Sequence, residues 1–147
     1  MAINPSFHVP SVADLDQLGV GSLFLGPVPI LNHLIRRLRI DELLRRHVDG
    51  ERTTGPSPGQ SLGVLLRNII LDRGPMYALE RWSSRFHPAV FGLDAARLRR
   101  LNDDRVGRAV DRLFDVDRAS MLTEVVVRAI KEFELDLSEF HKGPLSI

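Results

Sequence analysis

The sequence predicts an all-α protein that forms a single compact domain of six or seven helices. Apolar residues recur at intervals of three and four along most of the chain, which is the spacing of core-facing helix positions. Proline and glycine separate these periodic segments at short intervals. A length of 147 residues with 44% apolar content fits one domain with its own core. We expect an irregular N-terminal arm over residues 1–24 and the helical domain over residues 25–135.

Two helices are expected at the start of this domain. Pro27 and Pro29 suit the first turn of a helix, because proline needs no hydrogen-bond partner there. The inward stripe of this helix should be Ile30, Leu31, Leu34, Ile35 and Leu38. Residues 40–48 form the next expected helix, which is short and amphipathic with Leu43 and Leu44 inward and its arginines outward.

The third expected helix should be the central, buried one. Ser57 fits the N-cap, Pro58 fits the first turn, and Gln60 can complete a capping box with Ser57. Apolar residues lie nearly all around this helix, which is typical of a helix surrounded by others. They are Leu62, Val64, Leu65, Leu66, Ile69, Ile70 and Leu71.

The second half of the domain should contain further helices. Residues 77–86 are expected to form a helix with the core side chains Leu79, Trp82 and Phe86. The turn after it should add Val90 and Phe91 to the core. Asp94 should cap a short helix. A last helix should run from about Asp117 to about Glu134, with its inward residues Met121, Leu122, Val125, Val126, Ala129, Ile130 and Phe133. Residues 135–141 alternate like the start of a strand.

The stretch over residues 101–114 separates an apolar face from an arginine face. Arg105, Arg108 and Arg112 are spaced at i, i+3 and i+7. The expected core-facing residues are Val106, Ala109, Val110, Leu113 and Phe114. Guanidinium groups bind phosphates in a bidentate way, and the short helix before this one adds further arginines. The predicted DNA-binding residues are Arg105, Arg108, Arg112, Arg100 and Arg97. The two abutting helices can form a pair similar to a helix-turn-helix.

A structural interpretation of these arginines stays open. Five aspartates accompany seven arginines over residues 97–118, so the arginines can also form ion pairs on a solvated face. Eighteen of the 20 basic residues are Arg, a bias that a GC-rich coding sequence also produces. The net charge is only +1 and does not by itself indicate nucleic-acid binding. We nevertheless expect the face of Arg105, Arg108 and Arg112 to carry no carboxylate, which favours phosphate binding.

Composition argues against several classes of protein. The chain has no cysteine, which excludes disulfides, thiolate zinc sites and cysteine nucleophiles. The five histidines are scattered, and phosphate-binding loops and Ser-His-Asp motifs are missing. We therefore predict no enzyme activity, no metal and no cofactor. The N-terminal segment fits neither a signal peptide nor a membrane span, which predicts a cytoplasmic protein.

Residues 101–113 read Leu-Asn-Asp-Asp-Arg-Val-Gly-Arg-Ala-Val-Asp-Arg-Leu. This phrase resembles one in the helical N-terminal region of bacterial insertion-sequence transposases of the DDE class. Residues 25–32, 62–69 and 77–86 are similar to other parts of the same region, and the resemblance covers about residues 23–141. It implies that the chain corresponds to the helical domain that precedes the catalytic core of such enzymes.

The same resemblance extends to the residues around His141. In these transposases the element after the helical domain opens a ribonuclease-H-like core, and its first metal-binding Asp stands two residues after a His. His141 fits this phrase, but Gly143 stands where the Asp is expected. Glycine has no side chain to hold the divalent cation that two-metal catalysis requires. Residues 136–147 are therefore expected to be the truncated start of a missing catalytic core.

These inferences predict a transposase N-terminal domain, or truncated transposase, that binds DNA at the terminal repeats of its element and does not cut it. Such a protein would be associated with the nucleoid, without a membrane or small-molecule substrate. One alternative is an interaction module that packs on a transposase catalytic core or dimerises through the helix over residues 121–133. A second alternative is a decayed relic without a function.

Overall fold

The computed structural model describes residues 25–50 and 54–137, and this part of the chain contains only helices. The all-α prediction is therefore confirmed. The α-helices are α2 (Val28–Arg37), α3 (Ile40–Val48), α4 (Pro58–Leu71), α5 (Leu79–Ser83), α6 (Ala95–Leu98), α7 (Asp103–Asp115) and α8 (Arg118–Phe133). Two 3₁₀ helices, η1 (Met76–Ala78) and η2 (Pro88–Phe91), connect them.

Some expectations concern residues outside the described ranges. The N-terminal arm over residues 1–24 lies there, and so does most of the segment over residues 136–147. Residues 135–137 are described and do not form a strand. Among the helices that the structure describes, none is long and apolar enough to cross a membrane.

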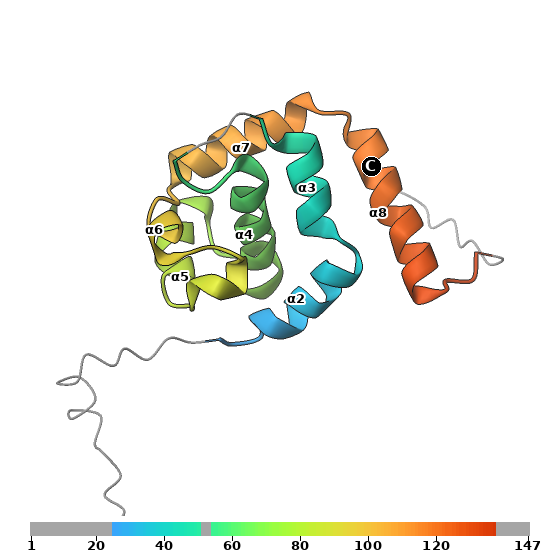
Figure 1. The fold of residues 1–147 in the computed structure, drawn as a ribbon, viewed down its shortest axis with the longest axis horizontal. Coiled ribbons are helices and arrows are strands. Elements are labelled where there is room, and N and C mark those ends of the chain that lie inside the picture. The colour runs from blue at the N-terminus through green and yellow to red at the C-terminus, as the bar shows by residue number, and fades with distance from the viewer. Residues whose placement is uncertain (1–24, 51–53, 138–147) are drawn as a thin grey trace, which may run out of the picture.

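Helix α4 lies at the centre of the domain, with α3 beside it and α7 across one end (Figure 1). The predicted capping box is confirmed: Ser57 Oγ accepts from Gln60 N at 3.2 Å, and Gln60 Oε1 accepts from Ser57 N at 2.9 Å. Helices α3 and α4 approach closely at Gly59, where a Cβ would lie 2.8 Å from the backbone nitrogen of Arg45. The packing of α3 on α4 therefore depends on a residue without a side chain.

Aromatic residues form the core at the other side of α4. Trp82 lies 4.9 Å from Phe86 and 5.7 Å from Phe91, measured between ring centroids. All three are buried, together with Leu79. The expected inward residues of this region are thus confirmed, although the expected helix over residues 77–86 divides into η1 and α5.

The structure exposes several residues that the sequence placed in the core. Ile69 and Ile70 of α4 are each about half exposed, whereas Arg67 and Asn68 directly before them are buried. Ile30 and Leu34 of α2 face outward, and α2 buries only Val28 and Ile35. Phe114 on α7 is 61% exposed. A helical period identifies a stripe, but neighbouring helices decide which part of it is covered.

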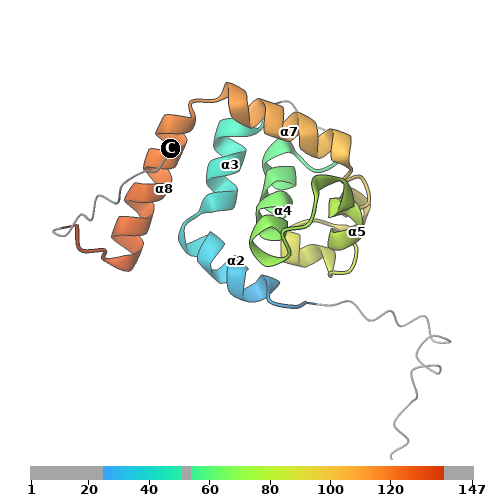
Figure 2. The same ribbon diagram turned by 180° about the vertical axis from the view of Figure 1, so that it is seen from behind.

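Helix α8 lies at the edge of the molecule, on the far side of α3 from α4 (Figures 1 and 2). Met121 is the only residue of α8 that is buried. Val125 is half-buried and packs against the same core cluster, as expected, and Ala129 and Ile130 are half-buried. Leu122, Val126 and Phe133 are exposed, which corrects the prediction for these three residues. Beside Met121 and Val125, ionic contacts connect α8 to α2 and α3, as between Arg37 Nε and Glu132 Oε1 at 2.7 Å.

Candidate nucleic-acid interface

The predicted pair of abutting helices is present. Asp94 caps α6 by accepting from Arg97 N at 2.7 Å, and Asn102 caps α7 by accepting from Arg105 N at 2.9 Å. Val106 and Ala109 turn inward from α7 and are buried, as predicted. The arginines of α7 therefore lie on the sides of this helix that do not face the core. The other arginines of this region lie on α6 and on the turn after it.

Two of the predicted DNA-binding arginines hold the chain that leads into α4. Arg105 is half-buried and donates to Arg100 O at 3.2 Å and to Pro56 O at 3.3 Å. Its guanidinium covers Gly55, where a Cβ would lie 2.9 Å from Cζ. Arg100 donates to Thr54 O. These two side chains therefore stabilise the connection between α3 and α4, and their donors are partly used by backbone carbonyls.

The other predicted arginines have carboxylates nearby. Arg108 is exposed, and three exposed aspartates lie along the same strip of α7 at i−4, i+3 and i+7: Asp104, Asp111 and Asp115. The expectation that this face carries no carboxylate is therefore wrong. Arg97 pairs with Asp94 at 3.6 Å, and Arg112 lies against Gly50, where a Cβ would be 2.9 Å from Nη1. The exposed strip of α7 has a net negative charge and repels phosphate.

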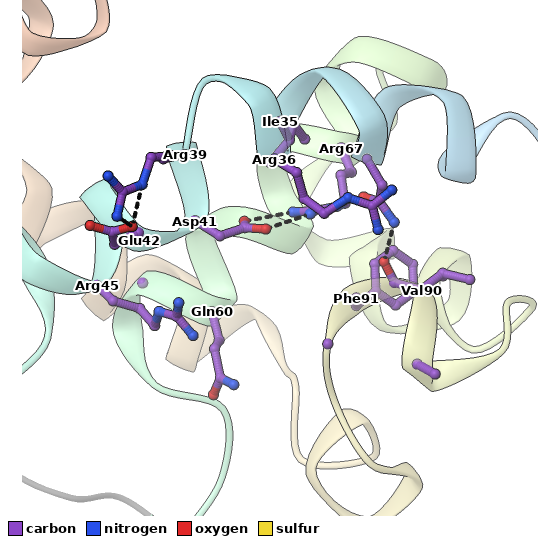
Figure 3. Close-up of a pocket in the computed structure, with 14 residues that line it drawn as sticks. Ile35, Arg36, Arg39, Asp41, Glu42, Arg45, Gln60, Arg67, Val90 and Phe91 are labelled. Atoms are coloured by element: carbon purple, nitrogen blue, oxygen red, sulfur yellow. Dashed lines mark hydrogen bonds and ion pairs between the residues drawn. The ribbon is translucent and has the colours of Figure 1, made fainter. Parts of the chain in front are cut away.

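A second candidate is a cavity of about 460 Å³ between α2, α3, α4 and η2 (Figure 3). Four arginines but only two carboxylates line this cavity, so its wall has an excess of positive charge. Its lining consists of Asn32, Ile35, Arg36, Arg39, Asp41, Glu42, Arg45, Gly59, Gln60, Arg67, Ala89, Val90, Phe91 and Gly92. Figure 3 shows Arg45 and Gln60 on one side of the cavity and Val90 and Phe91 on another.

A network around Arg67 connects the four elements of the cavity. Arg67 is buried and forms a bidentate pair with Asp41, with nitrogen–oxygen distances of 2.9 and 2.7 Å. Its Nε donates to Asn32 Oδ1 at 2.7 Å, and Asn32 Nδ2 donates to Val90 O at 2.6 Å. The guanidinium also donates to Gly63 O. Since its donors are used in this way, Arg67 shapes the cavity and is poorly placed to bind a ligand.

The remaining cations of the cavity differ in their partners. Arg39 pairs with Glu42 at 2.7 Å. Arg36 and Arg45 are exposed, and neither forms an ion pair with any residue of the described ranges. The guanidinium groups of Arg36 and Arg45 thus face the cavity from α2 and α3, and no carboxylate of the described residues pairs with either of them. This arrangement suits an anion with several oxygen atoms, such as a phosphate diester.

This cavity could not be recognised in the sequence. Its residues come from four elements that span residues 32–92, so no local motif contains them. One signal was present: Arg67 and Asn68 interrupt the apolar run of α4, and both are buried in the structure. A polar residue inside a buried helix requires a partner elsewhere in the fold. The sequence could indicate such a network but could not name its members.

Fold and cavity together define an all-α domain with a cavity whose lining has an excess of positive charge. The family model described as "Domain of unknown function (DUF4277)" matches residues 22–127. This match spans more than half of the chain, which therefore belongs to that family. Comparison with curated proteins and with solved structures gave no match.

Proposed function

We propose that this domain binds DNA at the ends of an insertion sequence, as the N-terminal part of a transposase, and does not itself cut DNA. The observation that supports DNA binding most directly is the cavity with its two uncompensated arginines, Arg36 and Arg45. The resemblance of residues 101–113 to transposase sequences supports the choice of DNA as the ligand. The glycine at position 143 argues against catalysis by this chain.

In this proposal the phosphate backbone lies over the cavity between α2 and α3. Arg36 and Arg45 donate to phosphate oxygens, and the amide of Gln60 adds a neutral donor at the same wall. The buried Arg67–Asp41 pair holds α3 on α4 and so fixes the positions from which Arg36 and Arg45 reach out. A protein with this function would be associated with the bacterial nucleoid.

Arg108 and Arg112 have a secondary role in this proposal. The aspartates beside Arg108 weaken its attraction for phosphate, because opposite charges on one helix face compensate each other. Arg105 and Arg100 contribute by holding the connection before α4. The structure thus favours different leading residues from those that the sequence indicated.

Fluorescence anisotropy tests this proposal with duplexes taken from the flanks of the gene and with scrambled duplexes. We expect the double variant Arg36→Ala, Arg45→Ala to bind more weakly at every salt concentration. Each lost phosphate contact should reduce the slope of log K against log salt by about 0.9, so the slope should fall by about 1.8. The control variant Arg81→Ala, Lys131→Ala removes the same charge from exposed positions outside the cavity and should bind as the wild type does.

A second variant separates the two candidate surfaces. The change of Arg105, Arg108 and Arg112 to Ala should weaken binding less than the loss of Arg36 and Arg45. The opposite order would move the DNA site to α7, as the sequence first indicated. Equal binding by all variants, or no preference for the flanking duplexes, would contradict DNA recognition by this domain.

A further inference from the structure

Helix α8 carries an apolar stripe that is exposed over most of its length; at its C-terminal end the Arg37 guanidinium of α2 lies 4.7 Å from the Phe133 ring centroid. The stripe repeats at intervals of three and four residues and consists of Ala119, Leu122, Val126, Ala129 and Phe133. Leu122 is 59% exposed and Val126 is 56% exposed. We call these five residues the α8 seam. Their spacing is that of the a and d positions of a coiled coil over two heptads.

The face of α8 that contacts the domain combines ionic contacts with the apolar contacts of Met121, which is buried, and of Val125, which packs against the same core cluster. Glu124 pairs with Arg46, and Arg128 donates to the carbonyl of Arg39 at 3.1 Å. Glu132 pairs with Arg37 near the other end of the helix. An amphipathic helix ordinarily buries its apolar side. In the part of the chain that the structure describes, α8 nevertheless leaves Leu122 and Val126 of its seam exposed, so that a partner can contact them.

We propose that the α8 seam binds the α8 seam of a second copy of this chain in antiparallel orientation, forming a two-fold symmetric dimer. A two-fold interface requires a surface that is complementary to itself. When Val126 lies opposite Ala129 of the second copy, Leu122 lies opposite Phe133. The small Ala129 then faces the larger Val126, which allows the helix axes to come within about 8–10 Å of each other.

The charges at the two ends of α8 favour the antiparallel orientation. Arg118 is exposed at the first residue of the helix, and Glu134 is exposed directly after the last. An antiparallel pair brings Arg118 to the end of the second helix that carries Glu134. A parallel pair would place Arg118 beside Arg118 and Glu134 beside Glu134, and repulsion between these like charges disfavours it. Phe114, before α8, is also exposed, and the Arg118 guanidinium lies 4.9 Å from its ring centroid.

This inference concerns a different surface from the proposed DNA site and does not depend on it. The first test is sedimentation equilibrium of the full chain, without DNA, over a range of concentrations. We expect the wild type to dimerise and Val126→Glu to remain monomeric. Val127→Glu is the matched control, because Val127 is 41% exposed but lies about 100° further around the helix, outside the seam. This control should dimerise as the wild type does.

Circular dichroism should show the same helix content in both glutamate variants, since both positions are already exposed. A monomeric wild type would overturn the proposal. A dimer that survives Val126→Glu, or that is lost equally in Val127→Glu, would also overturn it, because the contact would then lie elsewhere.

The orientation can be tested by cross-linking, since the chain has no cysteine of its own. With a short bismaleimide, Val126→Cys should be linked efficiently, because residue 126 lies near the two-fold axis. Ala119→Cys should not be linked, because an antiparallel pair separates the two copies of residue 119 by about 25 Å along the helix axis. Efficient linkage through residue 119 would show a parallel pair and contradict the proposed orientation.

Discussion

The buried ion pair between Arg67 and Asp41 gives the sharpest prediction for stability. Replacing Arg67 with Met keeps an unbranched side chain in the core of α4 and removes the guanidinium. Asp41 then loses a bidentate partner, and Asn32 Oδ1 loses its donor. The contacts that connect α2, α3 and η2 through Arg67 disappear together.

The size of the expected loss depends on the burial of the two partners. Removing one member of a buried ion pair costs about 3–5 kcal/mol. The Arg67 side chain is 4% exposed, but the Asp41 side chain is 41% exposed and can be hydrated after the change. The carbonyl of Gly63 retains the backbone hydrogen bond of the helix. The lower end of this range of free energies therefore applies. We expect the free energy of unfolding to fall by about 3 kcal/mol.

Urea unfolding can measure this loss through the fluorescence of Trp82, which is the only tryptophan and is buried. For a chain of this length the melting temperature should fall by about 6–12 °C. The exposed control Arg81→Met should change stability by less than about 0.5 kcal/mol. If Arg67→Met is equally mild, the pair does not hold the helices together. Adding Asp41→Leu to Arg67→Met should recover part of the loss, because it removes the unpaired charge.

Two further predictions concern packing and pH. Gly59→Ala should destabilise the domain, because the added Cβ would overlap the backbone of α3. Gly107→Ala should stabilise it by about 0.5–1 kcal/mol, because the Cβ meets no atom within 4 Å. Equal effects of the two variants in urea unfolding would contradict this packing. Desolvation raises the pKa of Glu124, but hydrogen bonds and charge interactions with Arg46 and His47 outweigh it, so the pKa lies below its usual range. Because the carboxylate is favoured in the folded state, its stabilising effect is present above the unfolded pKa of about 4.3 and is lost as the pH falls through the lowered value. Unfolding at pH 3 to 6 should show this loss, and Glu124→Gln should flatten the profile; an unchanged profile would refute the assignment.

The two proposed surfaces lie on different parts of the domain and can act together. The cavity is formed by α2, α3, α4 and η2, whereas the α8 seam faces outward at the edge of the molecule. A dimer joined through α8 would present two cavities related by a two-fold axis. Proteins that bind DNA as symmetric dimers contact two half-sites in this way.

Local features of the fold could be predicted from the sequence because they depend on neighbouring residues. The capping box of α4 needs only Ser57 and Gln60, which are three residues apart. Asp94 and Asn102 cap their helices for the same reason. Residues 40–48 form the expected helix with the expected ends, since its amphipathic pattern is short and clear.

Contacts between distant segments decided the rest. The period of α8 was identified correctly, but only Met121 and Val125 pack against the core, while Leu122 and Val126 remain exposed beside the ion pairs of Arg37 and Arg46 with this helix. Spacing alone placed Arg105 on an open face, whereas the structure lays its guanidinium on the connection before α4. The cavity with Arg36 and Arg45 exists only after α2, α3, α4 and η2 have come together. A sequence determines which face of a helix is apolar, but the partner that covers each face is chosen by the packing of the whole chain.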